Sequence, residues 1–189
     1  MVVVNEENHV MRLQSMIVML LVVGLLAVCS CNHGTTNADR SPTFAYAKET
    51  EGGCGDVFFH KGTADQREVM WISADKKKLK LPEEGSKTFD LAESPDGLQV
   101  AIDLWEAAPR FSAYCNDIGP DTKKQATWKA IDGRVTITVH APPDGPSPGP
   151  KRYKAGVKLE GVVFENDKGK HVTLPEEAIT EVEVGWYAG

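Results

Sequence analysis

The chain has 189 residues, of which 21 are Lys or Arg and 27 are Asp or Glu, so its formal net charge at pH 7 is −6. The charges are spread along the chain, and Lys76 to Lys78 form the only basic triplet. A mild acidic excess without a basic patch excludes the electrostatic footprint of a nucleic-acid-binding protein. About 158 residues follow position 31, which is enough for one domain with its own core.

An uncharged apolar run lies near the N-terminus. Residues 16–28 read MIVMLLVVGLLAV, and as a helix they would span about 20 Å, less than the ~30 Å hydrocarbon core of a bilayer. This length is typical of the apolar region of a signal peptide. Residues 1–10 contain Glu6 and Glu7 but no basic residue, whereas Met11 is followed by Arg12. We therefore predict a signal peptide that ends at residue 30, with translation starting at Met11.

Two cysteines, Cys29 and Cys31, follow this run. Cys31 comes directly after the small residue Ser30, and the sequence here resembles the lipobox of bacterial lipoproteins. In that family the signal peptide is cut before a cysteine whose thiol carries a diacylglyceryl group. The resemblance implies that Cys31 becomes the lipidated first residue, with Cys29 as the alternative. Two acyl chains are sufficient for stable anchoring, so we expect an exported protein held at the outer membrane or at the outer face of the plasma membrane.

The other two cysteines are expected to form a disulfide. If Cys31 carries the lipid, Cys29 leaves with the signal peptide and Cys54 and Cys115 remain. Two cysteines in an oxidising compartment pair by default. Neither lies in a C-x-x-C motif, which favours a structural bond over a redox-active thiol. Closing a loop of about 60 residues would contribute roughly 4 kcal/mol through the entropy of the unfolded chain.

The remainder divides into a tether and a domain. Residues 31–52 are mostly small and polar, with Phe44 and Tyr46 as exceptions, and this composition predicts a flexible tether. Residues 53–189 form the predicted domain.

The domain shows the period-two alternation of β-strands. Apolar and polar residues alternate clearly in 98–104, 135–139, 155–159 and 182–186, and more weakly in 56–60, 68–73, 87–91, 127–131 and 171–174. Beyond short turns expected at 77–81 or 175–178, no helix is predicted. About eight or nine short antiparallel strands predict an all-β domain, either a β-sandwich or, as the alternative, a partly open β-barrel. Residues 126–189 also resemble, loosely, sandwich modules of bacterial lipoproteins.

Turn residues separate these segments. Asp132 and Gly133 predict a two-residue hairpin between 128–131 and 134–139, and Asp96 and Gly97 predict a turn before 98–104. Five of the ten residues in 141–150 are proline, so this segment is predicted to be an exposed loop.

The sequence contains no recognisable catalytic, cofactor or metal motif. His33, His60, His140 and His171 are not spaced as metal ligands, and the acidic stretches 90–96 and 116–121 are typical of solvated turns. We therefore expect no catalytic residue, no cofactor and no metal. Packing of Trp105 against a second sheet is the favoured interpretation. If Trp105 and Tyr114 are instead exposed together, they would form a binding patch for a sugar or a peptide.

These observations favour an envelope-anchored lipoprotein whose domain binds or scaffolds without catalysis. Its partners would be the membrane, through the lipid, and an envelope protein or polysaccharide, but not nucleic acid. The alternative is an envelope hydrolase whose site is assembled from dispersed residues. A pocket that brings His60, His140 or His171 to Asp103 or Glu106 would favour that alternative.

Overall fold

The structure, a computed structural model, describes residues 40–109, 114–116, 119–140 and 152–185. Within them lie two short 3-10 helices, η2 (Lys48–Thr50) and η3 (Leu91–Glu93), and eight strands: β1 (Gly52–Cys54), β2 (Phe58–Gly62), β3 (Glu68–Ala74), β4 (Gly85–Asp90), β5 (Leu98–Trp105), β6 (Lys124–Val139), β7 (Tyr153–Glu165) and β8 (His171–Val184). The predicted signal peptide, both candidate lipidation cysteines and the proline-rich loop 141–150 lie outside the described residues.

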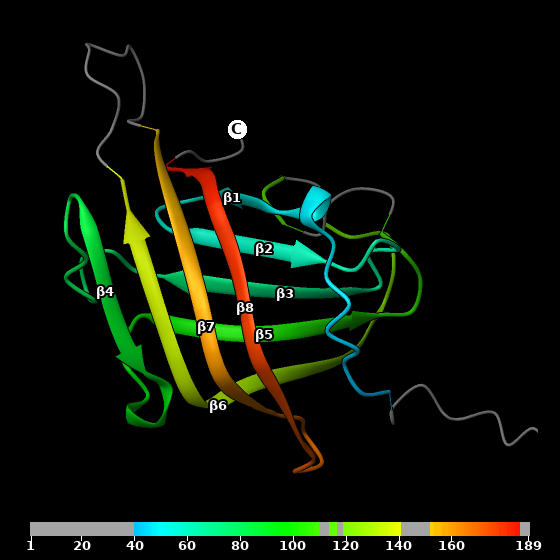
Figure 1. The fold of residues 1–189 in the computed structure, drawn as a ribbon. Coiled ribbons are helices and arrows are strands. Elements are labelled where there is room, and N and C mark those ends of the chain that lie inside the picture. The colour runs from blue at the N-terminus through cyan, green and yellow to red at the C-terminus, as the bar shows by residue number, and fades with distance from the viewer. Residues whose placement is uncertain (1–39, 110–113, 117–118, 141–151, 186–189) are drawn as a thin grey trace, which may run out of the picture. The chain divides into compact units, whose positions relative to one another are not determined.

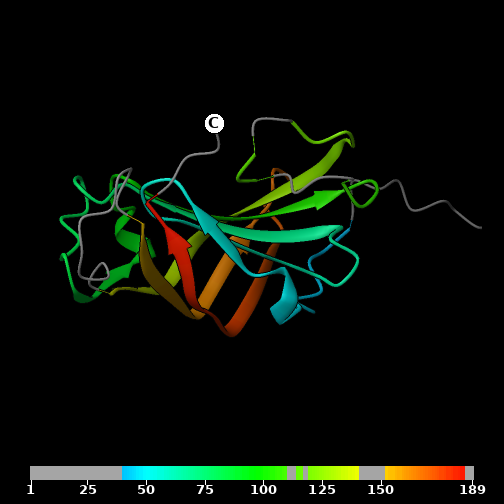
Figure 2. The ribbon, with the colours of Figure 1, turned by 90° about the horizontal axis from the view of Figure 1, so that it is seen from above.

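The strands form one antiparallel sheet that curls into two crossing layers. The strand order is β1-β2-β3-β5-β6-β7-β8, and β4 pairs with β6. In Figure 1, β1, β2, β3 and β5 run across the view while β7 and β8 cross in front of them, and Figure 2 shows the curl from above. The first part of β6 pairs with β5 and the last part pairs with β4, so β6 belongs to both layers. The all-β antiparallel prediction is confirmed, and the partly open barrel describes the sheet better than two separate sheets do.

A bend inside β6 makes the corner between the layers. The predicted hairpin at Asp132 and Gly133 is wrong, because both residues lie within β6, where the register with β7 shifts on either side of Asp132. Gly133 has a φ of +106°, and a Cβ there would lie 2.6 Å from the Cα of Val162. Glycine therefore allows β6 to bend closely against β7, and the strand turns a corner instead of reversing.

Most other strand predictions are confirmed in position, but the later strands are longer than expected. The segments 127–131 and 135–139 belong to one strand, β6, and the whole of 171–184 is likewise one strand, β8. The turn considered at 175–178 is therefore absent. Pro175 lies opposite Gly161 in the register of β7 and β8, next to neighbours whose pairing is regular. Because β8 is the last strand in the order, a residue without an N–H donor is tolerated there.

One hydrophobic core lies between the two layers. Alternate residues of the strands supply it, and its largest fully buried apolar members are Phe59, Met70, Ile72, Ile102, Leu104, Trp128, Ile137, Leu159, Phe164 and Ile179. Burying a side chain of this size contributes about 1.5–3 kcal/mol relative to leaving it exposed. The alternation also fixes which residues point away from the core. We call the side of β2, β3, β5 and the start of β6 that faces away from the core the outer face.

Residues 40–51 pack against the sheet, which differs from the flexible tether predicted for this part of the chain. Glu68 lies in phase with Met70 on the core side of β3, and it is 0% exposed. Its carboxylate accepts hydrogen bonds from Thr43 N (2.7 Å), Thr43 Oγ1 (2.9 Å) and Phe44 N (2.9 Å). The Phe44 ring packs 6.4 Å from the ring of Phe164. A buried carboxylate needs donors, and this segment supplies them.

Lys61 links the same segment to the last strand. Its Nζ lies 2.9 Å from Glu51 Oε1 and 2.9 Å from Glu177 Oε1, and it donates to Ala178 O at 3.0 Å. Burial by itself lowers the pKa of Lys61, but the hydrogen bonds to Glu177 and Glu51 outweigh burial and raise that pKa. Side chains therefore join β2 and β8, which are not neighbours in the sheet order.

Candidate functional site

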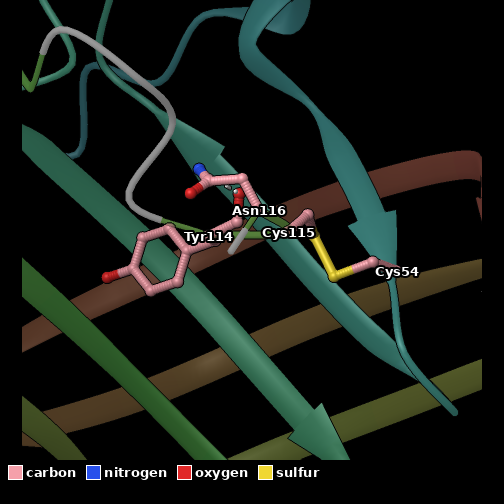
Figure 3. The surroundings of a disulfide bond; sticks show 4 residues. All are labelled: Cys54, Tyr114, Cys115 and Asn116. Atoms are coloured by element: carbon pink, nitrogen blue, oxygen red, sulfur yellow. Dashed lines mark hydrogen bonds between the residues drawn. A yellow bond between two sulfur atoms is a disulfide. The ribbon is translucent and has the colours of Figure 1, made fainter. Parts of the chain in front are cut away.

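The predicted disulfide between Cys54 and Cys115 is present in the structure. Cys54 ends β1, whereas Cys115 lies in the long connection between β5 and β6 and has a φ of +61°. Figure 3 shows Tyr114 and Asn116 on either side of Cys115, with the bond reaching across to Cys54. The bond therefore ties residues 114–116 to the edge of the first layer.

Tyr114, held in this way, packs on aromatic residues of the outer face. Its ring lies 5.6 Å from the ring of Phe58 and 5.9 Å from the ring of His60, both on β2. Phe58 in turn lies 6.2 Å from Trp71 on β3, with only 17° between the two ring planes. Phe58 and Trp71 alternate with the buried core residues Phe59 and Ile72, and they therefore point outward. We call Phe58, His60, Trp71 and Tyr114 the outer aromatic cluster.

A buried carboxylate, that of Asp103, accepts hydrogen bonds from two members of the cluster. Asp103 on β5 is 1% exposed, and its Oδ2 accepts hydrogen bonds from Trp71 Nε1 (3.0 Å) and from the Tyr114 hydroxyl (2.5 Å). The same oxygen lies 2.8 Å from Lys124 Nζ, and Oδ1 accepts a hydrogen bond from Thr127 Oγ1 at 2.6 Å. A carboxylate with four donors is satisfied in the way that a buried charge requires.

The same arrangement shifts the titration of two cluster members. Burial and the negative charge of Asp103 raise the pKa of Tyr114 well above its ordinary value of 10.0. Burial lowers the pKa of His60 below its ordinary value of 6.5. His60 lies against β1, since a Cβ on Gly52 would come within 2.3 Å of its Nε2. At neutral pH the cluster therefore presents a neutral imidazole and a neutral phenol.

This chemistry does not suit acid–base catalysis. Asp103 is shielded from water and already accepts from four groups, so it is not placed to take a proton from a substrate. His60 shares the outer face with Asp103, but the bonds to that carboxylate come from Trp71, Tyr114, Thr127 and Lys124. The geometry is that of a structural anchor beneath an aromatic surface.

An open groove of about 840 Å³ runs beside the cluster. Phe58 and Tyr114 give it two aromatic walls, and the disulfide lies at one end. Its polar lining includes Asp56, Asp75 and Gln99. The groove thus combines ring faces with hydrogen-bonding side chains, as ligand sites commonly do.

Two smaller hollows adjoin this groove. One of about 340 Å³ lies between Trp71 and Lys129, and Gln99 lines both it and the larger groove. Another of about 200 Å³ lies at His60, and Tyr114 lines both it and the larger groove. The cluster is therefore bordered by three hollows, and the largest of them shares a lining residue with each of the other two.

The patch considered from Trp105 and Tyr114 does not form, because Trp105 is buried. Trp105 is 4% exposed, and Lys124 Nζ lies 5.4 Å from its ring centre. The register shift between Leu104 and Trp105 occurs where β5 ends, so alternation along the strand is not a guide to the exposure of Trp105. Tyr114 is half-buried and belongs to the outer aromatic cluster instead.

The three histidines considered for a catalytic pocket that lie in the described residues are in different parts of the fold. His171 lies 2.6 Å from Glu165 at the β7–β8 hairpin, His140 follows β6, and His60 belongs to β2, so the three are not gathered in one pocket. Where the structure describes the chain, no group of three or more His, Cys, Asp or Glu side chains is placed to hold a metal ion. His33 lies outside the described residues.

One pattern in the sequence indicates this site, although it was not used in the sequence analysis. In β2 and β3 the residues Phe58, His60 and Trp71 are large aromatic or heteroaromatic side chains at positions that alternate with the core. Aromatic residues in outward phase on two neighbouring segments indicate a second packed or binding surface. The part played by Asp103 could not be found, because its donors come from three separate segments: β3, the connection that holds Tyr114, and β6.

Comparison of the chain with models of protein families, with curated proteins and with solved structures gives no match. Among the helices in the described part of the chain, none has the length and apolar character that crossing a membrane requires. The binding role of the domain is therefore inferred from the geometry of the outer face.

Proposed function

We propose that the protein is an exported, lipid-anchored domain of the cell envelope that binds a ligand without catalysis. The observation that carries the binding role is the outer aromatic cluster, which is bordered by an open groove of about 840 Å³ and fixed by the disulfide and by Asp103. A rigid aromatic surface loses little freedom when a ligand binds, and this favours affinity.

Two features support the envelope location. Residues 16–31 resemble a lipoprotein signal sequence, and the Cys54–Cys115 bond is typical of oxidising compartments. The hydrolase alternative has less support, because the carboxylate nearest the cluster is fully engaged. The binding proposal accounts for the groove without requiring a free catalytic acid or base.

The anchor is tested by growing the producing cells with a labelled palmitate analogue. We expect the wild-type chain to carry label and Cys31→Ser to lose it, while Cys29→Ser keeps it. Label on Cys31→Ser but not on Cys29→Ser would move the anchor to Cys29. Absence of label from the wild-type chain would overturn the lipid anchor.

The binding role is tested by co-sedimentation of the full chain, purified in mild detergent, with delipidated envelopes of the producing cells. We expect the wild-type chain to sediment and Phe58→Leu to stay in solution. Phe89→Leu is the matched control, since Phe89 is a half-buried phenylalanine on β4 in the other layer. Equal sedimentation of the two variants, or none for the wild type, would contradict a binding role for the cluster.

A further inference from the structure

Two hollows of the outer face share Gln99 in their linings, and we call the line from Phe58 through Gln99 to Trp71 the path. Gln99 lines both the larger groove, where Phe58 lies, and the hollow beside Trp71. Gln99 pairs with Ser73 in the register of β3 and β5, and Trp71 is two residues before Ser73 on the same strand. An occupant that follows this path touches Phe58, then Gln99, then Trp71, and it must therefore be extended.

The side chains along the path suit hydroxyl-rich rings. A pyranose has an apolar face of C–H groups that packs on an aromatic ring, while its hydroxyls both donate and accept hydrogen bonds. Phe58 and Trp71 supply ring faces, and Asp56, Asp75 and Gln99 supply acceptors and an amide donor around them. Two carboxylates with Lys77 in the larger groove also disfavour a strongly anionic chain.

The backbone beneath the path is already paired. Phe58 is paired with Ser73, Ser73 with Gln99 and Trp71 with Ala101, so the backbone at the path lies within the paired part of the sheet. An extended peptide that binds by adding a strand needs a free sheet edge, and this surface is a face. A ligand recognised by side chains alone fits the surface better.

From these observations we propose that the outer face binds a glycan chain of two or more sugar units, laid along Phe58, Gln99 and Trp71. This inference rests on the proposed binding function and names its ligand class. The disulfide contributes by holding Tyr114 beside the path, so that the wall of the groove is formed before the ligand arrives.

The experiment separates a glycan from a protein partner. Delipidated envelopes are divided into three portions: untreated, digested with protease, and oxidised with periodate, which cleaves vicinal diols of sugars. The full chain in mild detergent is sedimented with each portion. We expect sedimentation to survive protease and to be lost after periodate. Loss after protease with survival after periodate would overturn the glycan inference while leaving the binding function intact.

Absence of sedimentation with untreated envelopes would instead remove the binding function, and the glycan inference with it. A length series gives the second measurement, with chitohexaose and cellohexaose compared with N-acetylglucosamine and glucose by titration calorimetry. We expect at least one hexaose to bind more tightly than its monomer. Equal weak binding of hexaose and monomer would contradict an extended path.

Single substitutions locate the ligand. Gln99→Ala removes an exposed side chain shared by both hollows and should weaken binding roughly threefold to tenfold, the effect of about one lost hydrogen bond. Phe58→Leu keeps an apolar side chain but removes the ring, and it should weaken binding at least as much. Ile131→Ala, an exposed apolar residue at the β6 bend, is the control for folding and should bind as the wild type does. Unchanged affinity in both Gln99→Ala and Phe58→Leu would place the ligand elsewhere.

Discussion

Replacing Asp103 tests whether one buried carboxylate holds the outer aromatic cluster together. In Asp103→Ala the donors Trp71 Nε1, Tyr114 OH and Thr127 Oγ1 lose their common acceptor. Lys124 is less affected, since its side chain is 44% exposed and can turn to water. Removing one partner of a buried charged network costs about 3–5 kcal/mol, which is a large part of the ~5–15 kcal/mol that stabilises a typical domain.

The isosteric change Asp103→Asn should cost less, about 1–2 kcal/mol, because one oxygen remains as an acceptor for Trp71 and Tyr114, while the amide NH2 can donate to the Thr127 hydroxyl. Urea unfolding followed by tryptophan fluorescence gives the free energy of unfolding of both variants. A double-mutant cycle with Tyr114→Phe should then show coupling of about 0.5–3 kcal/mol between the two positions.

The reasoning is refuted if Asp103→Ala lowers the free energy of unfolding by less than about 0.5 kcal/mol, the usual effect of a surface substitution. It is also refuted if the cycle with Tyr114→Phe is additive. Either result would mean that the four donors find other partners without loss.

Four further changes are expected to have measurable effects. Cys115→Ser removes a bridge across 61 residues and should lower the free energy of unfolding by roughly 4 kcal/mol in a urea titration; an unchanged midpoint would contradict this. Gly133→Ala, at a φ of +106° with β7 backbone in contact, should cost about 1–3 kcal/mol and lower the melting temperature, and a neutral effect would disprove a tight corner. Glu68→Gln should speed hydrogen exchange at the two amides that Glu68 holds while the core amides stay protected; uniform exchange would show that the segment 40–51 is not separately held. The pKa values of Tyr46 and Tyr114 are raised, so above pH 10.0 only the unfolded chain loses these protons, and stability should fall by roughly 2–3 kcal/mol per pH unit, less in either Tyr→Phe variant.

Local alternation was enough to predict the fold class. Segment 98–104 lies in the structure as a strand with Val100, Ile102 and Leu104 in the core, because one side of it packs on the other layer. Segment 68–73 is also a strand, but Trp71, which was expected in core phase, points to the outer face, and Met70 and Ile72 are the core residues. The disulfide was also predictable, since counting cysteines needs no geometry. Neither prediction requires knowledge of which strands pair.

The bend of β6 at Gly133 could not be predicted from local alternation. An Asp-Gly pair between apolar segments has the same local signature in a hairpin and in a bulged strand, and the difference lies in the partner strand. Here the register between β6 and β7 shifts on either side of Asp132, and Gly161 on β7, with a φ of +60°, lies close to Gly133. Only the pairing of the two strands decides between reversal and bending.

The structural roles of the two buried acids, Glu68 and Asp103, could not be predicted from the sequence either. Glu68 stands in core phase beside Met70, which is a detectable anomaly, but the donors that satisfy it belong to Thr43 and Phe44, some 25 residues earlier. The segment was therefore predicted as a tether from its polar composition. Asp103 presents the same difficulty, because its partners come from three segments and no spacing in the sequence relates them.

The bend in β6 has a consequence for how the molecule comes apart. Because one continuous strand contributes hydrogen bonds to both layers, neither layer can be released while the other stays intact. The unfolding transition should accordingly be a single cooperative step, with identical midpoints by far-UV circular dichroism and by tryptophan fluorescence. Such all-or-none unfolding leaves few partly opened states for a protease to attack.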